Sequence, residues 1–277
     1  MMLSETTTAA ASSLRSKNDP MKTRFLLAAT FLALTLVPGA RAFQWDGVNQ
    51  PNASTLALFH FDEGKGDRAA NAAPDGSHLA FTSQKGGAAD TSPTWAPQPP
   101  CLDGGKGKAL RIEGNTMGFA GPKATAHAIE GLDPSAGLTV SFWFRAGPEE
   151  SPGVALVLMS TQNPRFEILF LVEKFPGTHR YFMVYGKTRF SGGKDLLDGD
   201  WHHMALVIAP AAAGSTVRFF RDGEKVEEKA ASEPPPGGKG ILTVGGNPFT
   251  GPGASFEMDE LLIQRGVLTD FTKPHGR

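Results

Sequence analysis

The chain has 277 residues, with 27 basic and 28 acidic side chains and a formal net charge of −1. A balance so close to neutral offers no broad field for attracting nucleic acid or an anionic membrane surface, so neither is expected as a partner. Its 33 glycines and 21 prolines, together with aromatic segments typical of strands, favour many turns over long helices.

The first 42 residues have the layout of an export signal behind a polar leader. Residues 1–20 are rich in Thr, Ala and Ser, as in a disordered leader or a start placed upstream of the true initiator, Met21. From Met21, two basic residues precede an apolar run over 25–37 and the small-residue end Ala40-Arg41-Ala42, which together predict a secretory signal peptide over 21–42. The apolar run is shorter than the about 20 residues that a transmembrane helix needs. We expect cleavage after Ala42, export to the periplasm or the cell surface, and no transmembrane segment in the mature chain.

The mature chain is predicted to open with a linker, residues 43–54, and a strand over 55–61. Residues 65–100 are rich in Gly, Ala, Asp and Pro and are predicted to form a long surface loop. Cys101 is the only cysteine, which excludes an intramolecular disulfide, and we interpret it as an ordinary loop residue rather than a reactive thiol. The glycine-rich segment 104–108 lacks the Ser/Thr and the following helix of a phosphate-binding loop, and is interpreted as a link to the next strand.

Four segments in the middle of the chain are typical of strands. Residues 138–145 alternate with a period of two, which predicts a strand with one face buried. Dense apolar runs over 154–159 and 166–172 predict strands covered on both faces, and residues 180–185 continue the series at the spacing of a sandwich. Prolines and glycines interrupt each run before a helix could complete three turns.

The most informative stretch is the pair of segments 199–208 and 217–226. The first reads Gly-Asp-Trp-His-His-Met-Ala-Leu-Val-Ile and predicts a turn followed by a strand. The second predicts a hairpin partner whose turn is Asp222-Gly223. Adjacent residues of a strand point to opposite faces, so His202 and His203 are not expected to share a metal or a general-base site.

The C-terminal part completes a single domain. The Pro/Gly-rich segment 232–240 is short enough to connect strands rather than domains, and 240–246 and 255–267 predict the last strands. No internal repeat is visible. We therefore predict one domain over residues 55–272, followed by a short tail, 273–277.

Six pieces of this chain occur in the order of a known family. They are 58–64, 108–112, 138–143, 201–205, 220–223 and 258–261. In this order they resemble the laminin G-like jelly roll of the concanavalin A-like lectin and glucanase superfamily, over about residues 55–272. The resemblance implies an all-β fold, a two-sheet antiparallel jelly-roll sandwich with its first and last strands side by side. The signal segment at 21–42 predicts that a cleaved signal helix precedes this domain. Such folds bind more often than they catalyse.

The resemblance also implies a structural calcium ion near the meeting of the first and last strands. Two acidic pairs, Asp62-Glu63 and Asp259-Glu260, offer the oxygen ligands that calcium prefers. The following loop departs from the family pattern, because an Asn-Ala-Ala-Pro-Asp-Gly sequence over 71–76 replaces the expected aspartate and Ser-Gly-Asn turn. Solvated turn carboxylates without an ion are the alternative.

Carbohydrate cleavage requires two carboxylates that face each other across the scissile bond. Glu257 and Asp259 share a strand face, and glucanases of this superfamily carry a third carboxylate that is missing here. No catalytic residue is therefore expected, and the protein is interpreted as a non-enzyme.

Binding residues are sought among the aromatic and polar side chains, because sugars stack on aromatic rings and hydrogen-bond with polar groups. We name Trp143, Arg145, Tyr185 and Asn247 as candidates for contact with a ligand. Trp201 is a further candidate for contact with a ligand, although Trp143 and Trp201 also fit positions that the family buries in its core.

The sequence is consistent with three functions. The leading hypothesis is an exported, non-catalytic binding module for a glycan or an extracellular or cell-envelope protein. The first alternative is a structural module of an envelope assembly that binds no small ligand, and the second is a degenerate glycan-cleaving enzyme.

Overall fold

The computed structural model describes residues 45–74, 78–83, 93–114, 122–125, 127–160, 166–175, 178–191, 197–246 and 253–275. The leader and the signal peptide predicted for residues 1–42 lie outside these ranges, as does the candidate ligand residue Asn247. Within the described part, no helix is long and apolar enough to cross a membrane.

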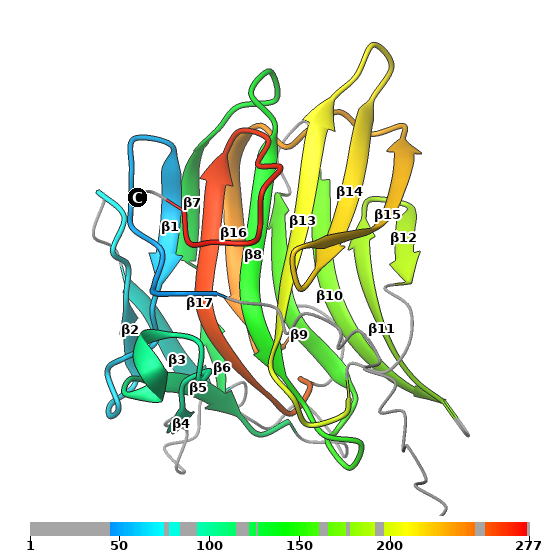
Figure 1. Ribbon diagram of the computed structural model, residues 1–277. Coiled ribbons are helices and arrows are strands. Elements are labelled where there is room, and N and C mark those ends of the chain that lie inside the picture. Colours follow the sequence, from blue (N-terminus) through cyan, green and yellow to red (C-terminus); the bar gives the residue numbers. More distant parts are fainter. Residues whose placement is uncertain are drawn as a thin grey trace, which may run out of the picture. The chain divides into compact units, whose positions relative to one another are not determined.

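The described strands form two large antiparallel sheets and one small sheet (Figure 1). The first sheet has the order β15 (Glu224–Ala231), β14 (Ser215–Arg221), β13 (His202–Pro210), β8 (Leu138–Arg145), β17 (Phe256–Arg265), β5 (Lys108–Ile112) and β4 (Thr94–Pro97), and β1 (Thr55–Phe59) also pairs with β17. The second has the order β12 (Thr188–Ser191), β11 (Thr178–Tyr185), β10 (Phe166–Phe175), β9 (Gly153–Ser160), β16 (Gly238–Val244) and β7 (His127–Leu132). The small sheet has the order β2 (Arg68–Ala70), β3 (His78–Ser83) and β6 (Pro122–Thr125). The predicted all-β jelly-roll sandwich is confirmed.

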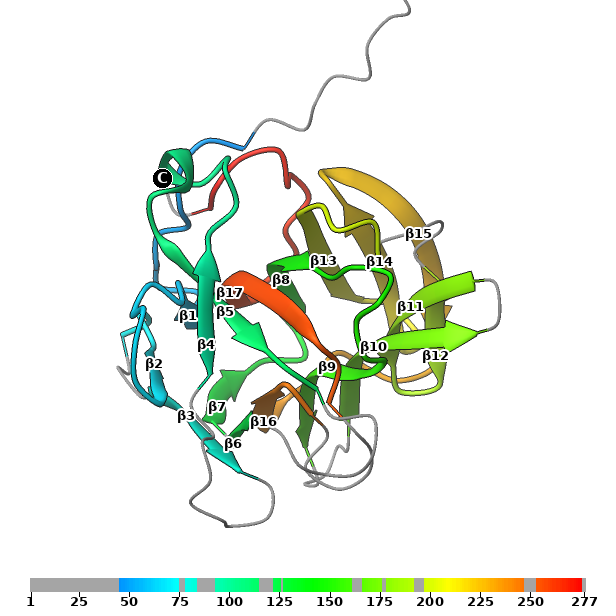
Figure 2. The same cartoon turned by 90° about the horizontal axis from the view of Figure 1, so that it is seen from below.

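The core lies between the two large sheets, which Figure 2 shows as two layers. On β8, Val140, Phe142 and Phe144 alternate toward this core, as the two-residue period predicts. The ring of Phe170 on β10 meets them from the second sheet, with its centroid 5.2 Å from that of Phe142 and 4.9 Å from that of Phe144. These edge-to-face contacts join the two layers at their centre.

Strand β17 changes its partner halfway along its length. Residues 256–258 pair with β5, whereas residues 261–264 pair with β1, and the register against β8 shifts between Asp259 and Leu262. Glu260 at this bulge has a φ of +49°, a conformation that residues other than glycine rarely adopt. The first and last strands of the sandwich therefore lie side by side, as the family resemblance implies.

Both ends of the described chain cover the outer face of the first sheet (Figure 1). The N–H of Gln50 donates to the carbonyl of His275 at 2.8 Å, and the N–H of His275 donates to Asn49 Oδ1 at 2.9 Å. Trp45 lies against His203, with ring centroids 4.5 Å apart. The predicted linker and tail thus contain residues that pack on the sandwich.

The region 65–100, which composition predicts as a loop, contains the three short strands β2, β3 and β4. Each of them pairs with another strand of the region or with a strand outside it, such as β5 or β6. Local composition is a poor guide here, because the formation of such short strands depends on tertiary pairing.

Candidate functional site

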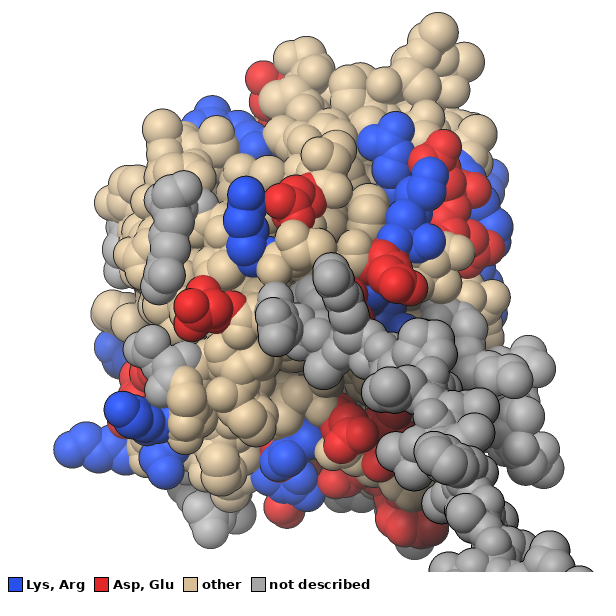
Figure 3. Space-filling model, viewed as in Figure 1, with Lys and Arg blue, Asp and Glu red and all other residues tan. Residues whose placement is uncertain are grey.

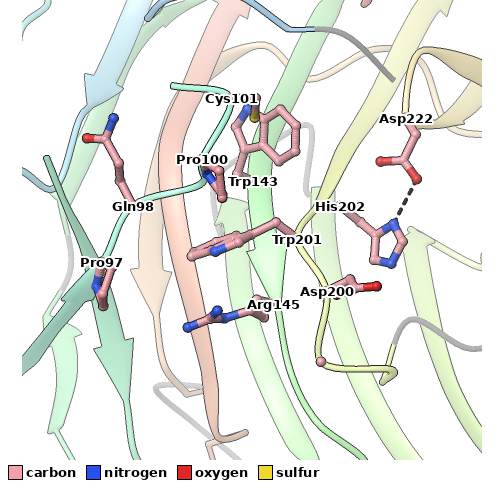
Figure 4. A pocket seen from close by; sticks show the side chains of 11 residues that line it. Pro97, Gln98, Pro100, Cys101, Trp143, Arg145, Asp200, Trp201, His202 and Asp222 are labelled. Atoms are coloured by element: carbon pink, nitrogen blue, oxygen red, sulfur yellow. Dashed lines mark hydrogen bonds and ion pairs between the residues drawn. The ribbon is translucent and has the colours of Figure 1, made fainter. Parts of the chain in front are cut away.

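The described surface has a hollow of about 560 Å³ on the outer side of the first sheet (Figure 4). Its walls come from the segment 97–101, from β8, and from the turn and strand that begin at Gly199. The predicted pattern Asp-Trp-His at 200–202 thus supplies one whole side of it. Trp143 and Arg145, two of the predicted ligand residues, also line this hollow together with Trp201.

Trp201 is half-buried at the centre of the hollow and is held there by Arg145. The guanidinium carbon of Arg145 lies 5.1 Å from the centroid of the Trp201 ring, a cation–π contact. Arg145 in turn donates from Nε to Glu257 Oε2 at 2.6 Å, and Glu257 Oε1 accepts from Arg111 at 3.2 Å. Both oxygens of Glu257 are therefore engaged by arginines, which fixes Arg145 beneath the indole.

His202 forms the polar end of the hollow with Asp222, opposite Gln98 (Figure 4). Its Nδ1 lies 2.7 Å from Asp222 Oδ2 and its Nε2 lies 3.2 Å from Asp198 Oδ2. Burial acts to lower the pKa of His202, but hydrogen bonds and charges from Asp222 and Asp198 outweigh it and raise that pKa. Asp222 also accepts the N–H of His203 at 2.9 Å, so the hairpin turn is tied to the start of β13, which directly follows Trp201.

His203, the neighbour of His202, lies in a different environment, as strand geometry predicts. It is 1% exposed, with Trp45 against its ring and Trp143 beside it on the neighbouring strand β8. Burial, and secondarily the charge of His275, lowers the pKa of His203 to about 3, so its ring is neutral at physiological pH. Cys101 lines the hollow, and burial raises the pKa of its thiol to about 11, with Asp259 and Asp222 adding to the effect. A protonated thiol is a poor nucleophile.

A second hollow, of about 370 Å³, shares Gln98 with the first. Its charged members are His60, Asp62, Lys106 and Lys108, and Val48 supplies an apolar wall. The sequence places Lys106 and Lys108 in a glycine-rich link and gives no indication that they line a hollow. This hollow could not be predicted from a local pattern, because Gln98 and His60 are brought together only by the fold.

The four carboxylates predicted to bind calcium lie near one another but already have protein partners. Asp62 Oδ1 accepts the N–H of Lys108 at 2.9 Å, and Glu63 Oε1 accepts that of Ala70 at 2.8 Å. Glu260 Oε2 accepts the N–H of Asn49 at 2.7 Å, while Glu260 Oε1 lies 2.5 Å from Nδ1 of His60.

Asp259 is 1% exposed, and its Oδ1 accepts the N–H of Glu260 at 2.8 Å. Burial raises the pKa of Asp259 well above its usual range, and the charges of Glu260, Asp62 and Glu63 raise it further, which favours the protonated form. Among the described residues, no group of three or more His, Cys, Asp or Glu side chains is placed to hold a metal ion. Glu63 Oε2, in contrast, is buried without a hydrogen-bond partner in the part of the chain that the structure describes. Calcium binding stays a prediction.

The remaining predicted ligand residues do not join the hollow. Tyr185 on β11 is fully buried in the core, where its hydroxyl donates to the carbonyl of Pro234. A side chain in that position cannot stack on a ligand at the surface. Asn247 lies outside the described residues.

The family to which the chain belongs follows from a comparison with protein-family models. A family model described as the concanavalin A-like lectin/glucanases superfamily matches residues 120–271. The chain belongs to this superfamily. The laminin G-like resemblance found in the six sequence pieces is thereby confirmed, and no curated protein sequence matches the chain.

Several solved structures resemble the described fold at low sequence identity. The described fold is similar to domain 4 of an extracellular arabinanase from Geobacillus stearothermophilus in complex with arabinotriose, with a TM-score of 0.50, 19% identity, and coverage of 78% of this chain and 94% of that one. It is also similar to a Trypanosoma rangeli sialidase in complex with sialic acid, with a TM-score of 0.49, 12% identity, and coverage of 79% and 32%. A mouse laminin alpha1 chain matches with a TM-score of 0.40, 17% identity, and coverage of 52% and 40%. At such identities the likeness is one of fold alone.

Proposed function

We propose that this protein is an exported binding module that recognises a glycan at the hollow around Trp201 and does not cleave it. The observation that carries the proposal is the half-buried indole of Trp201, held over Arg145 in a hollow with polar groups at both ends. An aromatic side chain with hydrogen-bonding neighbours is the arrangement that recognises a sugar ring, because the ring has apolar C–H faces and polar hydroxyl edges. The hollow's volume of about 560 Å³ lies within the usual range of small-ligand sites.

The positions of Glu257 and Asp259, the two carboxylates that the sequence places on one strand face, support binding rather than cleavage. Glycoside hydrolysis needs one carboxyl group as a proton donor and a second, ionised one as a nucleophile or base, both facing the substrate. Glu257 is 6% exposed and is engaged by Arg111 and Arg145, and Asp259 is 1% exposed beneath the layer that covers the sheet. Neither of them lines the hollow around Trp201, so neither faces a sugar bound there.

The test is a binding assay that also detects cleavage. Purified protein from Phe43 to Arg277 is incubated with a panel of insoluble and immobilised polysaccharides, and the supernatant is assayed for released sugar ends. We expect retention on at least one polysaccharide without release, and loss of retention for Trp201→Ala. Phe182→Ala is the matched control, because Phe182 is a half-buried aromatic residue beneath an arginine, Arg189, on the second sheet.

Other outcomes point to the other two functions. Release of sugar ends would identify an enzyme. Failure to bind any polysaccharide would contradict the proposal, and a stable envelope partner that co-purifies with the protein would then favour the structural module. Export is tested separately by the N-terminus of the protein recovered outside the cytoplasm, which we expect at Phe43.

A further inference from the structure

The two hollows are neighbours that meet at one side chain. Gln98 lines both of them, is 5% exposed, and donates from its amide to the carbonyl of Leu102. Gly107 lies directly beside it, since a Cβ at Gly107 would lie 1.6 Å from Gln98 Oε1 and 2.3 Å from Asp62 Oδ1. The absence of a side chain at position 107 thus allows Gln98 to sit at the junction. The two hollows therefore share a wall at Gln98.

The charges differ between the far ends of these hollows. The first ends at Asp200 and Asp222, on the side of Trp201 away from Gln98 (Figure 4). The second, which shares Gln98 with the first, contains Lys106, Lys108 and His60. On the face shown in Figure 3, acidic and basic side chains are otherwise interspersed, so no wide field of one sign masks this local difference.

The lining of the second hollow has two lysines against one carboxylate, Asp62. Asp62 keeps its negative charge while its Oδ1 accepts the backbone N–H of Lys108, and the ammonium groups of Lys106 and Lys108 form none of the ion pairs of the described residues, so the positive side chains remain in excess. His60 has its Nδ1 engaged by Glu260, which leaves Nε2 as its second hydrogen-bonding atom. Donors of this kind favour an acidic oxygen group.

We propose that the second hollow is a subsite for a carboxylate or sulfate group on a glycan whose adjacent ring contacts Trp201. This inference rests on the proposed function and specifies its substrate class as acidic polysaccharides. Asp200 gives the site a direction, because it repels an acidic group at the opposite end of the first hollow.

The test compares polymers that differ only in charge. Polygalacturonate is compared with its fully methyl-esterified form, and dextran sulfate with dextran, using the protein from Phe43 to Arg277 and isothermal titration or affinity electrophoresis. We expect at least one acidic polymer to bind about tenfold more tightly than its neutral counterpart, from one or two charge-assisted contacts. The pair that shows the preference identifies the acidic group as carboxylate or sulfate.

The decisive variant is Lys106→Gln combined with Lys108→Gln. It should abolish the preference for the acidic polymer and leave the affinity for the neutral one unchanged. Lys225→Gln combined with Lys239→Gln removes the same charge from β15 and β16 and should keep the preference. Melting temperatures of both double variants establish that they are folded.

The other possible results distinguish the failure of the subsite from the failure of the proposed function. Equal binding of acidic and neutral polymers, or a preference that survives in the Lys106/Lys108 double variant, overturns the subsite and leaves the proposed function intact. Binding of no polymer at all overturns both proposals. Trp201→Ala separates them further, since it should weaken the binding of acidic and neutral polymers alike.

Discussion

Glu257 connects to Trp201 only through Arg145: its Oε2 accepts from Arg145 Nε at 2.6 Å, and the Arg145 guanidinium carbon lies 5.1 Å from the Trp201 ring centroid. The position that suggests a catalytic carboxylate in the sequence is thus occupied by a residue that orients an arginine. Its Oε1 is held by Arg111 at 3.2 Å, and Arg111 also donates to Glu150 at 3.2 Å. The ion pairs therefore extend from the hollow to the neighbouring strand β5.

Glu257→Gln keeps the shape of this side chain and removes its charge. We expect a loss of about 1.5–3 kcal/mol in the free energy of unfolding, because charge-assisted hydrogen bonds to Arg145 and Arg111 become neutral ones. Polysaccharide binding should weaken as well, since Arg145 is no longer fixed under Trp201. Chemical denaturation and the binding assay measure the two effects.

Glu228→Gln is the control for this variant. Glu228 also pairs with an arginine, Arg218, at 2.9 Å, but it lies on the exposed face of β15. Exposed pairs contribute little to stability, so its removal should leave both stability and binding nearly unchanged. Equal effects of the two substitutions would contradict the special role of Glu257.

Phe170→Ala is expected to destabilise the sandwich by about 3–5 kcal/mol, because it removes a fully buried ring and leaves a cavity between the sheets. The ring contacts Phe142 and Phe144 from the opposite layer, so little of the space can be refilled locally. Val226→Ala, at the most exposed large apolar side chain of the described chain, should change stability by less than about 0.5 kcal/mol. The comparison is made by denaturant midpoints. A small loss for Phe170→Ala would place the core elsewhere.

The sandwich fold could be predicted from the sequence, whereas the assembled site could not. Strand β8 could be predicted because its side chains alternate between the two faces of the strand. The position of β1 beside β17 could be predicted from the ordered pieces of the family pattern. The short strands β2, β3 and β4 could not be predicted, because such short segments form strands only through pairing: β2 pairs with β3, β3 also with β6, and β4 with β5.

The site is harder to predict because it is made of contacts between distant residues. Trp143 and Arg145 could be named from one strand, but the fold alone brings Gln98 beside them, and it buries Tyr185 although the ring looks suited to a ligand. His60 and Glu260 are 200 positions apart in the sequence. Their contact depends on the bulge in β17, for which the sequence carries no clear signal.

A structural calcium ion is a prediction that a melting experiment tests directly. Calcium should raise the melting temperature and a chelator should lower it, and Asp62→Asn should remove the shift, because an ion binds the folded state only. The ion would compete with His60 for Glu260, so the shift should be larger at a pH where His60 is neutral. Magnesium at equal concentration controls for ionic strength. A melting temperature that stays constant across millimolar calcium rules out the ion.

The pair of His60 and Glu260 makes stability depend on pH in a direction that can be worked out. Burial acts to lower the pKa of His60, but the hydrogen bond to Glu260 and the charges of Glu260, Asp62 and Glu63 outweigh it and raise that pKa above 6.5. The stabilisation from a raised histidine pKa is fully present below the pKa of the unfolded chain and is lost as pH rises through the folded value. His60→Gln should therefore cost more stability at about pH 5.5 than at about pH 9.

A double-mutant cycle isolates this contribution from the other histidines, since the pKa of His202 is also raised and that of His275 is lowered. The free energy of unfolding is measured against pH for the unsubstituted protein, His60→Gln, Glu260→Gln and the double variant. We expect the coupling between the two positions to be largest below pH about 6.5 and to fall as His60 loses its proton. A coupling that is independent of pH, or that grows toward alkaline pH, would show that His60 is already neutral when it meets Glu260.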